Sequence, residues 1–121
     1  MSPDRLAYRL AELTDTKQAG EIVVLDMREL VSYTDFLVIC TARNERQAGA
    51  IREAVELDLK RAEGLRPGRV EGSGAAGWLL LDYLDCVLHV FTPEARERYG
   101  LEVLWSDAPR LELDLVGAAS A

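Results

Sequence analysis

Histidine and cysteine are scarce in this chain of 121 residues, which has one histidine and two cysteines. Cys40 and Cys86 lie 46 positions apart, so they form neither a disulfide framework nor a CxxC metal site. Both lie in apolar runs, which predicts buried, reduced thiols. His89 alternates with Val87 and Phe91, which favours a hydrogen-bonded structural imidazole over a catalytic one.

Long apolar runs and phosphate-binding loops are also missing. The longest uncharged apolar stretch, residues 74–81, is too short to span a bilayer, and Asp4 lies where a signal peptide would be apolar. We therefore expect a cytoplasmic protein with no membrane association. No glycine-rich segment has either standard spacing of a phosphate-binding loop, so no cofactor is expected.

Lysine and arginine are outnumbered: there are 14 of them against 21 Asp and Glu, for a formal net charge of −7. The deficit is concentrated in residues 70–121, which hold nine acids and three bases. Binding to nucleic-acid phosphates depends on clustered, uncompensated cations. Direct DNA or RNA binding is therefore disfavoured as the main activity, and a basic protein partner fits the charge better.

Hydrophobic periodicity supports a folded domain, since 49% of the residues are hydrophobic. It predicts a helix over 3–19, strands over 21–26 and 35–42, and a second helix over 44–62. A glycine-rich loop over 64–77 follows, with a brief edge strand at 69–71. Next come hairpin strands over 78–83 and 86–92 with a turn at 84–85, a short helix over 92–99, and residues 101–105, which lead into a polar tail.

The connections between these elements predict the fold class. Eight residues between the first two strands are too few for a crossover helix, so these strands are expected to be antiparallel neighbours. The predicted fold class is α/β: a single domain over 1–115, with a mixed four- to five-stranded sheet flanked by helices. Residues 116–121 are expected to form a short C-terminal tail.

Particular residues are expected at the helix ends. Asn44 and Gln47 have the spacing of a capping box, and Thr92 is expected to cap the last helix ahead of a proline. Gly20 and Gly64 are expected to end the first and second helices.

One group of residues suggests enzymatic chemistry. Nucleotidyltransferases place a Gly-Ser turn at a triphosphate, ahead of two strand carboxylates that hold magnesium, and here Ser73 precedes Asp82 and Asp85. Alternate strand positions put both carboxylates on one side, as two-metal chemistry requires. Asp82 and Asp85 are instead spaced i and i+3, and Asp85 falls in the expected turn. Structural acids are therefore favoured over a metal site.

Aromatic residues are concentrated in the last third of the chain, at Trp78, Tyr83, Phe91, Tyr99 and Trp105. Tryptophan and tyrosine often anchor protein interfaces, but they also fill small cores. Phe91 is expected in the core. For Trp78, which shares a strand face with Leu80 and Asp82, interface and core remain equal alternatives.

These residues resemble the ribosomal silencing factor family, also called Iojap-like. The similarity is carried by WLLLDY at 78–83, Asp85, HVF at 89–91, PEAR at 93–96, Tyr99, and LE and LW at 101–102 and 104–105. Upstream, DFLVI at 35–39, NERQ at 44–47 and residues 67–72 match the same family in order. The resemblance covers about residues 6–115.

The resemblance implies a non-enzymatic translational repressor. Such a protein binds the large ribosomal subunit through its fourteenth protein, blocks joining of the small subunit and lowers translation under nutrient limitation. The implied fold is nucleotidyltransferase-like without catalytic residues, and some members form homodimers. Two alternatives stay open: a nucleotidyltransferase-like enzyme that uses Ser73, Asp82 and Asp85, and a large-subunit assembly factor without anti-association activity.

The residues expected to contact the partner belong to the resembling blocks and to the acidic, aromatic last third of the chain. They are Glu71, Trp78, Leu80, Asp82, Tyr83, Asp85, His89, Arg96, Tyr99 and Trp105.

Overall fold

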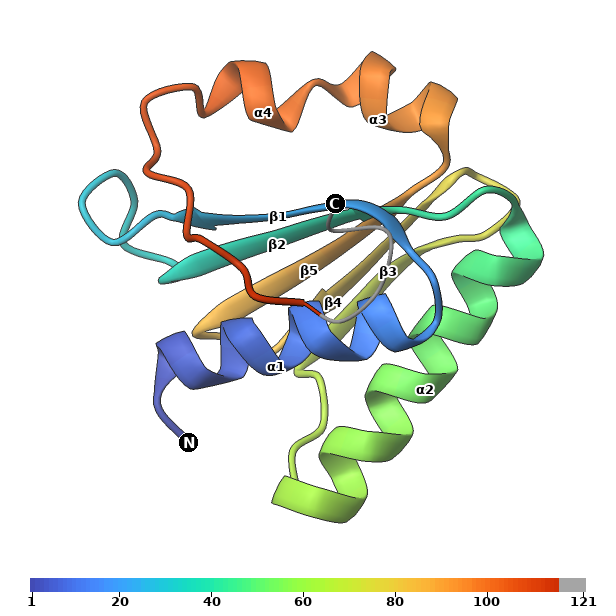
Figure 1. Ribbon diagram of the computed structural model, residues 1–121, viewed down its shortest axis with the longest axis horizontal. Coiled ribbons are helices and arrows are strands. Elements are labelled where there is room, and N and C mark those ends of the chain that lie inside the picture. Colours follow the sequence, from blue (N-terminus) through green and yellow to red (C-terminus); the bar gives the residue numbers. More distant parts are fainter. Residues whose placement is uncertain (116–121) are drawn as a thin grey trace.

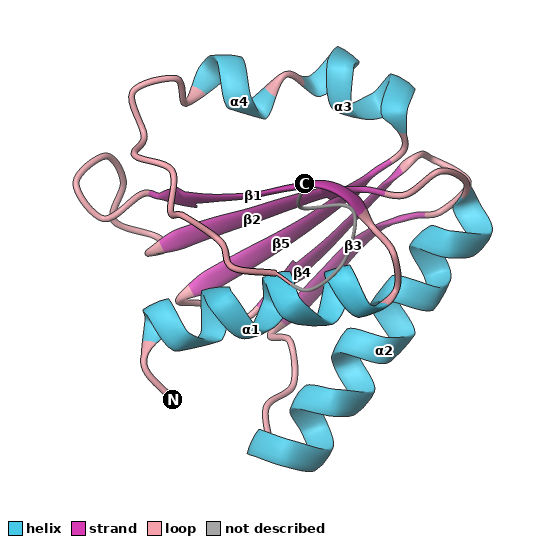
Figure 2. Ribbon diagram, in the orientation of Figure 1, coloured by secondary structure: helices cyan, strands magenta, loops and turns pink. Residues whose placement is uncertain are grey.

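Five strands form one mixed sheet in the computed structural model, which describes residues 1–115 (Figures 1 and 2). The elements in chain order are α1 (Pro3–Thr16), β1 (Gly20–Asp26), β2 (Phe36–Thr41), α2 (Glu45–Glu63), β3 (Arg69–Ser73), β4 (Trp78–Asp82), β5 (Cys86–Phe91), α3 (Pro93–Tyr99) and α4 (Leu101–Leu104). The tail predicted over 116–121 lies outside the described residues.

The strands lie in the order β1-β2-β5-β4-β3. β1 and β2 are antiparallel, as their short connection predicts, and β4 and β5 form the predicted hairpin. β2 and β5 are parallel, so the sheet is mixed. The predicted α/β class with a helix-flanked sheet is therefore confirmed. None of the helices within residues 1–115 has the length and apolar character needed to cross a membrane.

The helices form a layer on each side of the sheet (Figure 1). α1 and α2 cover one face, where Leu10 and Ile51 belong to the larger core cluster. α3 and α4 lie over the other face, where Ile39 and Phe91 belong to a second cluster. The predicted division of β4 is confirmed, because Leu79, Leu81 and Tyr83 join the first cluster, whereas Leu80 and Trp78 join the second. Both thiols are buried and free, as predicted.

The first helix ends earlier than predicted, at Thr16 instead of Ala19. Gln18 adopts a left-handed conformation with φ of 62°, so the turn begins before Gly20 is reached. The side-chain amide of Gln47, on α2, donates hydrogen bonds to the carbonyl oxygens of Lys17 and Gln18 at 2.9 and 3.0 Å. A contact with a distant helix thus satisfies carbonyl groups just beyond this helix end.

The predicted cap of α2 is present. Asn44 Oδ1 accepts a hydrogen bond from the Gln47 backbone N–H at 2.8 Å, and Gly64 ends the helix with φ of 65°. The return bond of the box differs, because Gln47 Oε1 accepts from the N–H of Arg43. Thr92 precedes α3 as expected, but its side chain makes no cap hydrogen bond, so that part of the prediction is wrong.

Two segments are more ordered than predicted. The glycine-rich loop contains β3, which runs to Ser73 instead of Glu71 and pairs along all of β4. Residues 101–104, expected to lead into the tail, form the short helix α4. Gly100, with φ of 58°, separates α3 from α4 and lets the chain begin a second turn.

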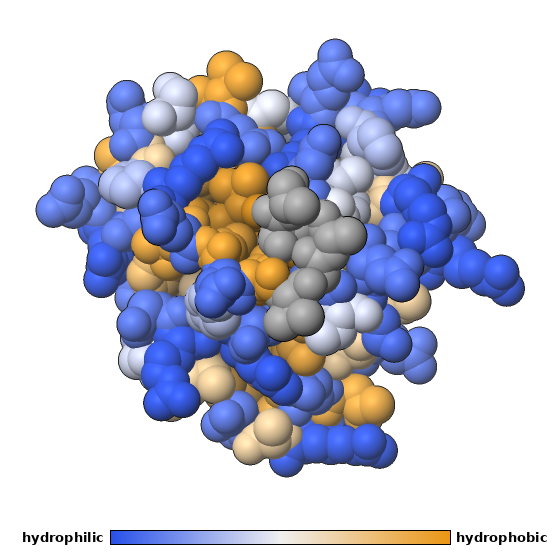
Figure 3. All heavy atoms as spheres, in the orientation of Figure 1, coloured by the Kyte–Doolittle hydropathy of each residue, from blue (hydrophilic) through white to orange (hydrophobic). Residues whose placement is uncertain are grey.

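The chain after α4 crosses toward α1 as the C-terminal strap, residues 109–115 (Figure 1). Backbone hydrogen bonds from Asp26 to Pro109 and from Leu111 to Val24, at 2.8 and 2.9 Å, tie it to the outer edge of β1. The leucines at positions 111, 113 and 115 pack against the first core cluster. In Figure 3, hydrophobic side chains gather near the middle of the same view and hydrophilic ones surround them.

Candidate functional site

Five of the residues expected to contact a partner share the sheet face on which α3 and α4 lie: Glu71, Trp78, Leu80, Asp82 and His89. The register pairs Glu71 with Leu80, and Leu80 with His89, and cross-strand partners share a face. Trp78 and Asp82 lie two positions on either side of Leu80, so strand alternation gives them the same face. The fold therefore brings these five residues together on three adjacent strands.

Trp78 belongs to a continuous group of aromatic rings. Its ring centroid lies 5.8 Å from that of Tyr99 and 6.3 Å from that of His89. The Phe91 ring lies 5.7 Å from His89 and 5.6 Å from Tyr99. Phe91 is 1% exposed, as its prediction as a core residue requires, while Tyr99 is 51% exposed. Trp78 is half-buried, so it combines features of both predicted alternatives.

His89 is held inside this group. Its Nδ1 accepts a hydrogen bond from the Trp78 indole N–H at 3.1 Å. Burial lowers its pKa to about 4, so the imidazole is neutral at pH 7. A neutral imidazole that accepts at Nδ1 carries its proton on Nε2. His89 is therefore a buried, hydrogen-bonded imidazole, as predicted, and its contact with a partner stays a prediction.

Arg96, on α3, makes its contacts within the chain. Its guanidinium pairs with Glu102 Oε1 at 2.7 Å and donates to the Glu21 carbonyl oxygen and the Thr41 hydroxyl at 2.6 and 2.8 Å. The bond from Arg96 lowers the pKa of the Glu102 carboxyl below its ordinary value. The Arg96 side chain is only 10% exposed and braces α3 against β1 and β2. Its contact with a partner stays a prediction.

Tyr99 and Trp105 belong to the helical layer, Tyr99 at the end of α3 and Trp105 just after α4. Trp105 is half-buried against the second core cluster. Val103 and Leu104, which sequence reasoning did not single out, are 81% and 66% exposed on α4. Two exposed apolar side chains on α4 therefore lie outside the predicted set of residues.

Tyr83 and Asp85 lie away from the other predicted contacts. Tyr83 faces α1 and α2, is 7% exposed, and has a pKa raised by burial to about 12. Its hydroxyl is buried with no hydrogen-bond partner within residues 1–115. Asp85 is exposed in the β4–β5 turn, at the opposite end of β4 from Trp78. The ten predicted residues thus do not form a single surface.

Arg69 is a charged neighbour that sequence reasoning missed. Its Nε pairs with Glu71 at 2.7 Å, and its Nη2 lies 3.7 Å from an Asp82 carboxylate oxygen. The i, i+2 spacing of Arg69 and Glu71 on an edge strand was the signal that could have found it. The Arg69 side chain is 62% exposed, and exposed ion pairs contribute little stability. The Arg69 pairs therefore add little to the stability of this sheet edge.

The fold does not bring together Ser73, Asp82 and Asp85, the residues of the nucleotidyltransferase-like alternative. Ser73 pairs with the first residue of β4, whereas Asp82 is the last, and four steps along a strand span about 13 Å. Ser73 Oγ accepts from the Ala76 N–H at 3.1 Å, and Asp82 Oδ1 from the Leu84 N–H at 2.8 Å, so both stabilise turns. Across residues 1–115, no three His, Cys, Asp or Glu side chains are grouped to hold a metal ion.

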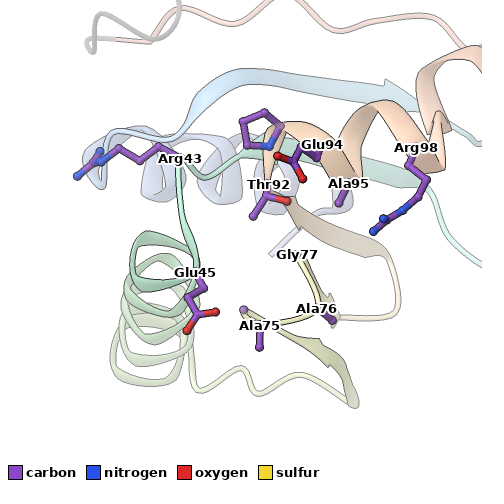
Figure 4. Close-up of a pocket in the computed structure, with 11 residues that line it drawn as sticks. Arg43, Glu45, Ala75, Ala76, Gly77, Thr92, Glu94, Ala95 and Arg98 are labelled. Carbon is purple, nitrogen blue, oxygen red and sulfur yellow. The ribbon is translucent and has the colours of Figure 1, made fainter.

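A pocket of about 490 Å³ lies between the starts of α2 and α3 and the β3–β4 turn (Figure 4). Its charged lining residues are Arg43, Glu45, Glu94 and Arg98. Figure 4 places the two arginines at opposite ends of the pocket, with side chains that do not converge. The charges compensate one another, and the pocket lacks the clustered cations that a nucleotide triphosphate requires.

Comparisons with known proteins identify the family. A family model described as "Ribosomal silencing factor during starvation" matches residues 1–121. The ribosomal silencing factor of Halalkalibacterium halodurans is 36% identical over 114 residues, which are 94% of this chain and 97% of that protein. "Mitochondrial assembly of ribosomal large subunit protein 1" of Mus musculus is 31% identical over 102 residues, which are 80% of this chain and 43% of that protein.

A solved structure shares the fold over nearly the whole chain. It is a crystal structure of a Chromobacterium violaceum protein, with a TM-score of 0.83 and 27% sequence identity, covering 99% of this chain and 98% of that one. The similar proteins are named as silencing or assembly factors and not as enzymes, in agreement with the non-enzymatic prediction. The chain belongs to the ribosomal silencing factor family.

Proposed function

We propose that this protein represses translation in the cytoplasm by binding the large ribosomal subunit and sterically blocking subunit joining when nutrients are limiting. The proposed contact is the fourteenth protein of the large subunit, as the family resemblance implies. The observation that carries the proposal is the aromatic pair of half-buried Trp78, on the sheet face that also bears Glu71 and Asp82, and half-exposed Tyr99, on the helix α3 over that face.

Such a surface suits a basic protein partner. Trp78 and Tyr99 offer large apolar area with few rotatable bonds, which is typical of interface anchors. Glu71 is 45% exposed and Asp82 is 22% exposed, so both carboxylates reach solvent on the same sheet face as Trp78. Acidic side chains around an apolar centre steer and orient a cationic partner.

Repression by this route requires only that the protein is bound at its site on the large subunit. A bound protein excludes the small subunit because two bodies cannot occupy one volume, so no nucleotide, metal or turnover enters the mechanism. Repression should saturate near one copy per large subunit, or near one dimer if the homodimer implied by the resemblance forms there. The Ser73→Ala variant should repress like the wild type.

Sedimentation of the two purified ribosomal subunits, with and without the protein, tests the proposal. We expect the protein to shift joined ribosomes to free subunits and to travel with the large one. Joined ribosomes that persist at saturating protein, with the protein bound to the large subunit, would contradict steric blocking.

A second candidate is an assembly factor for the large subunit. The mouse relative favours it, because that protein is named for assembly of the mitochondrial large subunit. An assembly factor should associate with immature large subunits and leave the joining of mature subunits unchanged. Comparing immature and mature large subunits in the same gradient separates the two functions.

A further inference from the structure

Trp78 and His89 are diagonal neighbours on adjacent antiparallel strands. Trp78 lies directly opposite Phe91, and His89 precedes Phe91 by two residues on the same face. The Trp78 and His89 rings are nearly parallel, with 20° between their planes, and the indole Nε1 lies 3.1 Å from the imidazole Nδ1. The rings therefore lie side by side with the hydrogen bond between their edges.

Packing restricts the orientation of His89 itself. The imidazole is 9% exposed, and the Phe91 ring lies against it at 5.7 Å with 8° between the planes. Burial holds its pKa near 4, so Nδ1 remains an acceptor throughout the physiological pH range. Indole nitrogen can only donate, and leaving a buried donor unpaired costs about 1–3 kcal/mol. The bond therefore selects one orientation of the indole.

The strand on the other side closes around Trp78. Gly72, with φ of 80°, pairs one position from Trp78 in the β3–β4 ladder, and a Cβ on Gly72 would collide with the Trp78 carbonyl oxygen and crowd Cε3 of the indole. The Tyr99 ring completes the surroundings at 5.8 Å. Backbone, imidazole and phenol ring together hold the indole in a half-open cradle.

We propose that His89 is a positioning residue: its Nδ1 fixes the Trp78 indole in the orientation that meets the basic protein surface of the large subunit. The partner contacts Trp78 and Tyr99, and His89 acts through Trp78. This inference rests on the proposed function, because it explains how Trp78, one of the proposed contact residues, is held rigid. A preorganised anchor loses less conformational freedom when it binds, which raises affinity without a new contact.

The test compares His89→Asn with His89→Leu. The Asn amide oxygen can replace Nδ1 as the acceptor, whereas Leu fills similar space without one. We expect the Asn variant to keep the chemical shift of a hydrogen-bonded Trp78 indole N–H in ¹⁵N-correlated NMR spectra, and the Leu variant to lose it. Binding to the large subunit should stay near wild type for Asn and weaken about tenfold for Leu. The Trp78→Phe variant shows which of the two indole N–H signals belongs to Trp78 and which to Trp105.

A double-mutant cycle separates positioning from general stabilisation. If His89 acts only through the indole N–H, His89→Leu should add no loss of affinity in a Trp78→Phe background. Thermal melts of all variants identify any loss that merely follows stability. Full additivity of the two changes, or wild-type affinity in the Leu variant, would overturn the positioning role alone. Failure of the wild-type protein to bind the large subunit would overturn the proposed function.

Discussion

The guanidinium Nε of Arg96 lies 2.7 Å from Oε1 of Glu102, so one ion pair joins α3 to α4 across the left-handed turn at Gly100. Glu102→Ala leaves a guanidinium that is 10% exposed with only the more distant Glu21 carboxylate, at 4.0 Å. We expect a loss of about 2 kcal/mol in the free energy of unfolding, measured with urea. Glu97→Ala, at an exposed position of α3, is the control and should change it by less than about 0.5 kcal/mol.

Gly72→Ala should destabilise the protein by about 3 kcal/mol, because the new Cβ meets the Trp78 backbone at a left-handed position. Gly49, inside α2, has no heavy atom within 4 Å of its would-be Cβ. Gly49→Ala should therefore stabilise the helix by about 0.5–1 kcal/mol. Thermal melts of both variants make the comparison, and a shift of the same sign in both would refute the close approach at Gly72.

Tyr83→Phe removes a hydroxyl that is buried without a hydrogen-bond partner in the described part of the chain. We expect the free energy of unfolding to stay unchanged or to rise by about 1 kcal/mol, because the folded state no longer buries an unpaired polar group. Affinity for the large subunit should not change, since Tyr83 faces α1 and α2. A weaker complex would place Tyr83 among the partner contacts after all.

Glu71→Lys should weaken binding to the large subunit by about tenfold at low ionic strength, because it sets a cation against a basic partner and beside Arg69. The effect should shrink as salt rises, since exposed charges are screened over about 8–10 Å. Glu53→Lys makes the same charge change at an exposed position of α2. Binding measured across a salt series decides, and equal losses in both variants would point to net charge alone.

The stability of the protein should fall as the medium becomes more acidic, through His89. Burial lowers its pKa from 6.5 to about 4, so the unfolded chain takes up a proton that the folded chain refuses between these values. Above pH 6.5 His89 is neutral in both states, and the free energy of unfolding has its full value. It falls by about 2 kcal/mol between pH 6.5 and pH 5, because the unfolded state gains a proton there. His89→Leu should flatten this part of the urea-derived stability curve. Parallel curves for the two proteins would disprove the assignment.

Strand alternation predicts which residues share the candidate surface, because successive side chains along a strand point to opposite faces of the sheet. Trp78, Leu80 and Asp82 were placed together on that ground alone, and Leu79, Leu81 and Tyr83 opposite them. The bond from Trp78 to His89 was also within reach. Counting back from the turn at 84–85 pairs Leu80 with His89 and makes Trp78 its diagonal neighbour.

Other features depend on contacts between distant segments, and local patterns do not contain them. The end of α1 follows from Gln47, which binds carbonyl groups about 30 positions earlier in the chain. Nothing in the local pattern around Arg96 indicates that β1, β2 and α4 together surround its guanidinium. The unpaired hydroxyl of Tyr83 likewise emerges only once both helices are packed over the sheet.

The two outer edges of the sheet are unequal. The C-terminal strap is bonded to β1, whose register also shifts between Gly20 and Val23, whereas β3 forms the last strand among residues 1–115 with its outer side unpaired. Irregular or covered edges do not accept another strand, and open ones do. If two copies joined through the sheet edges described over residues 1–115, they would therefore meet β3 against β3, and the strap-covered edge at β1 would oppose further growth into a fibre.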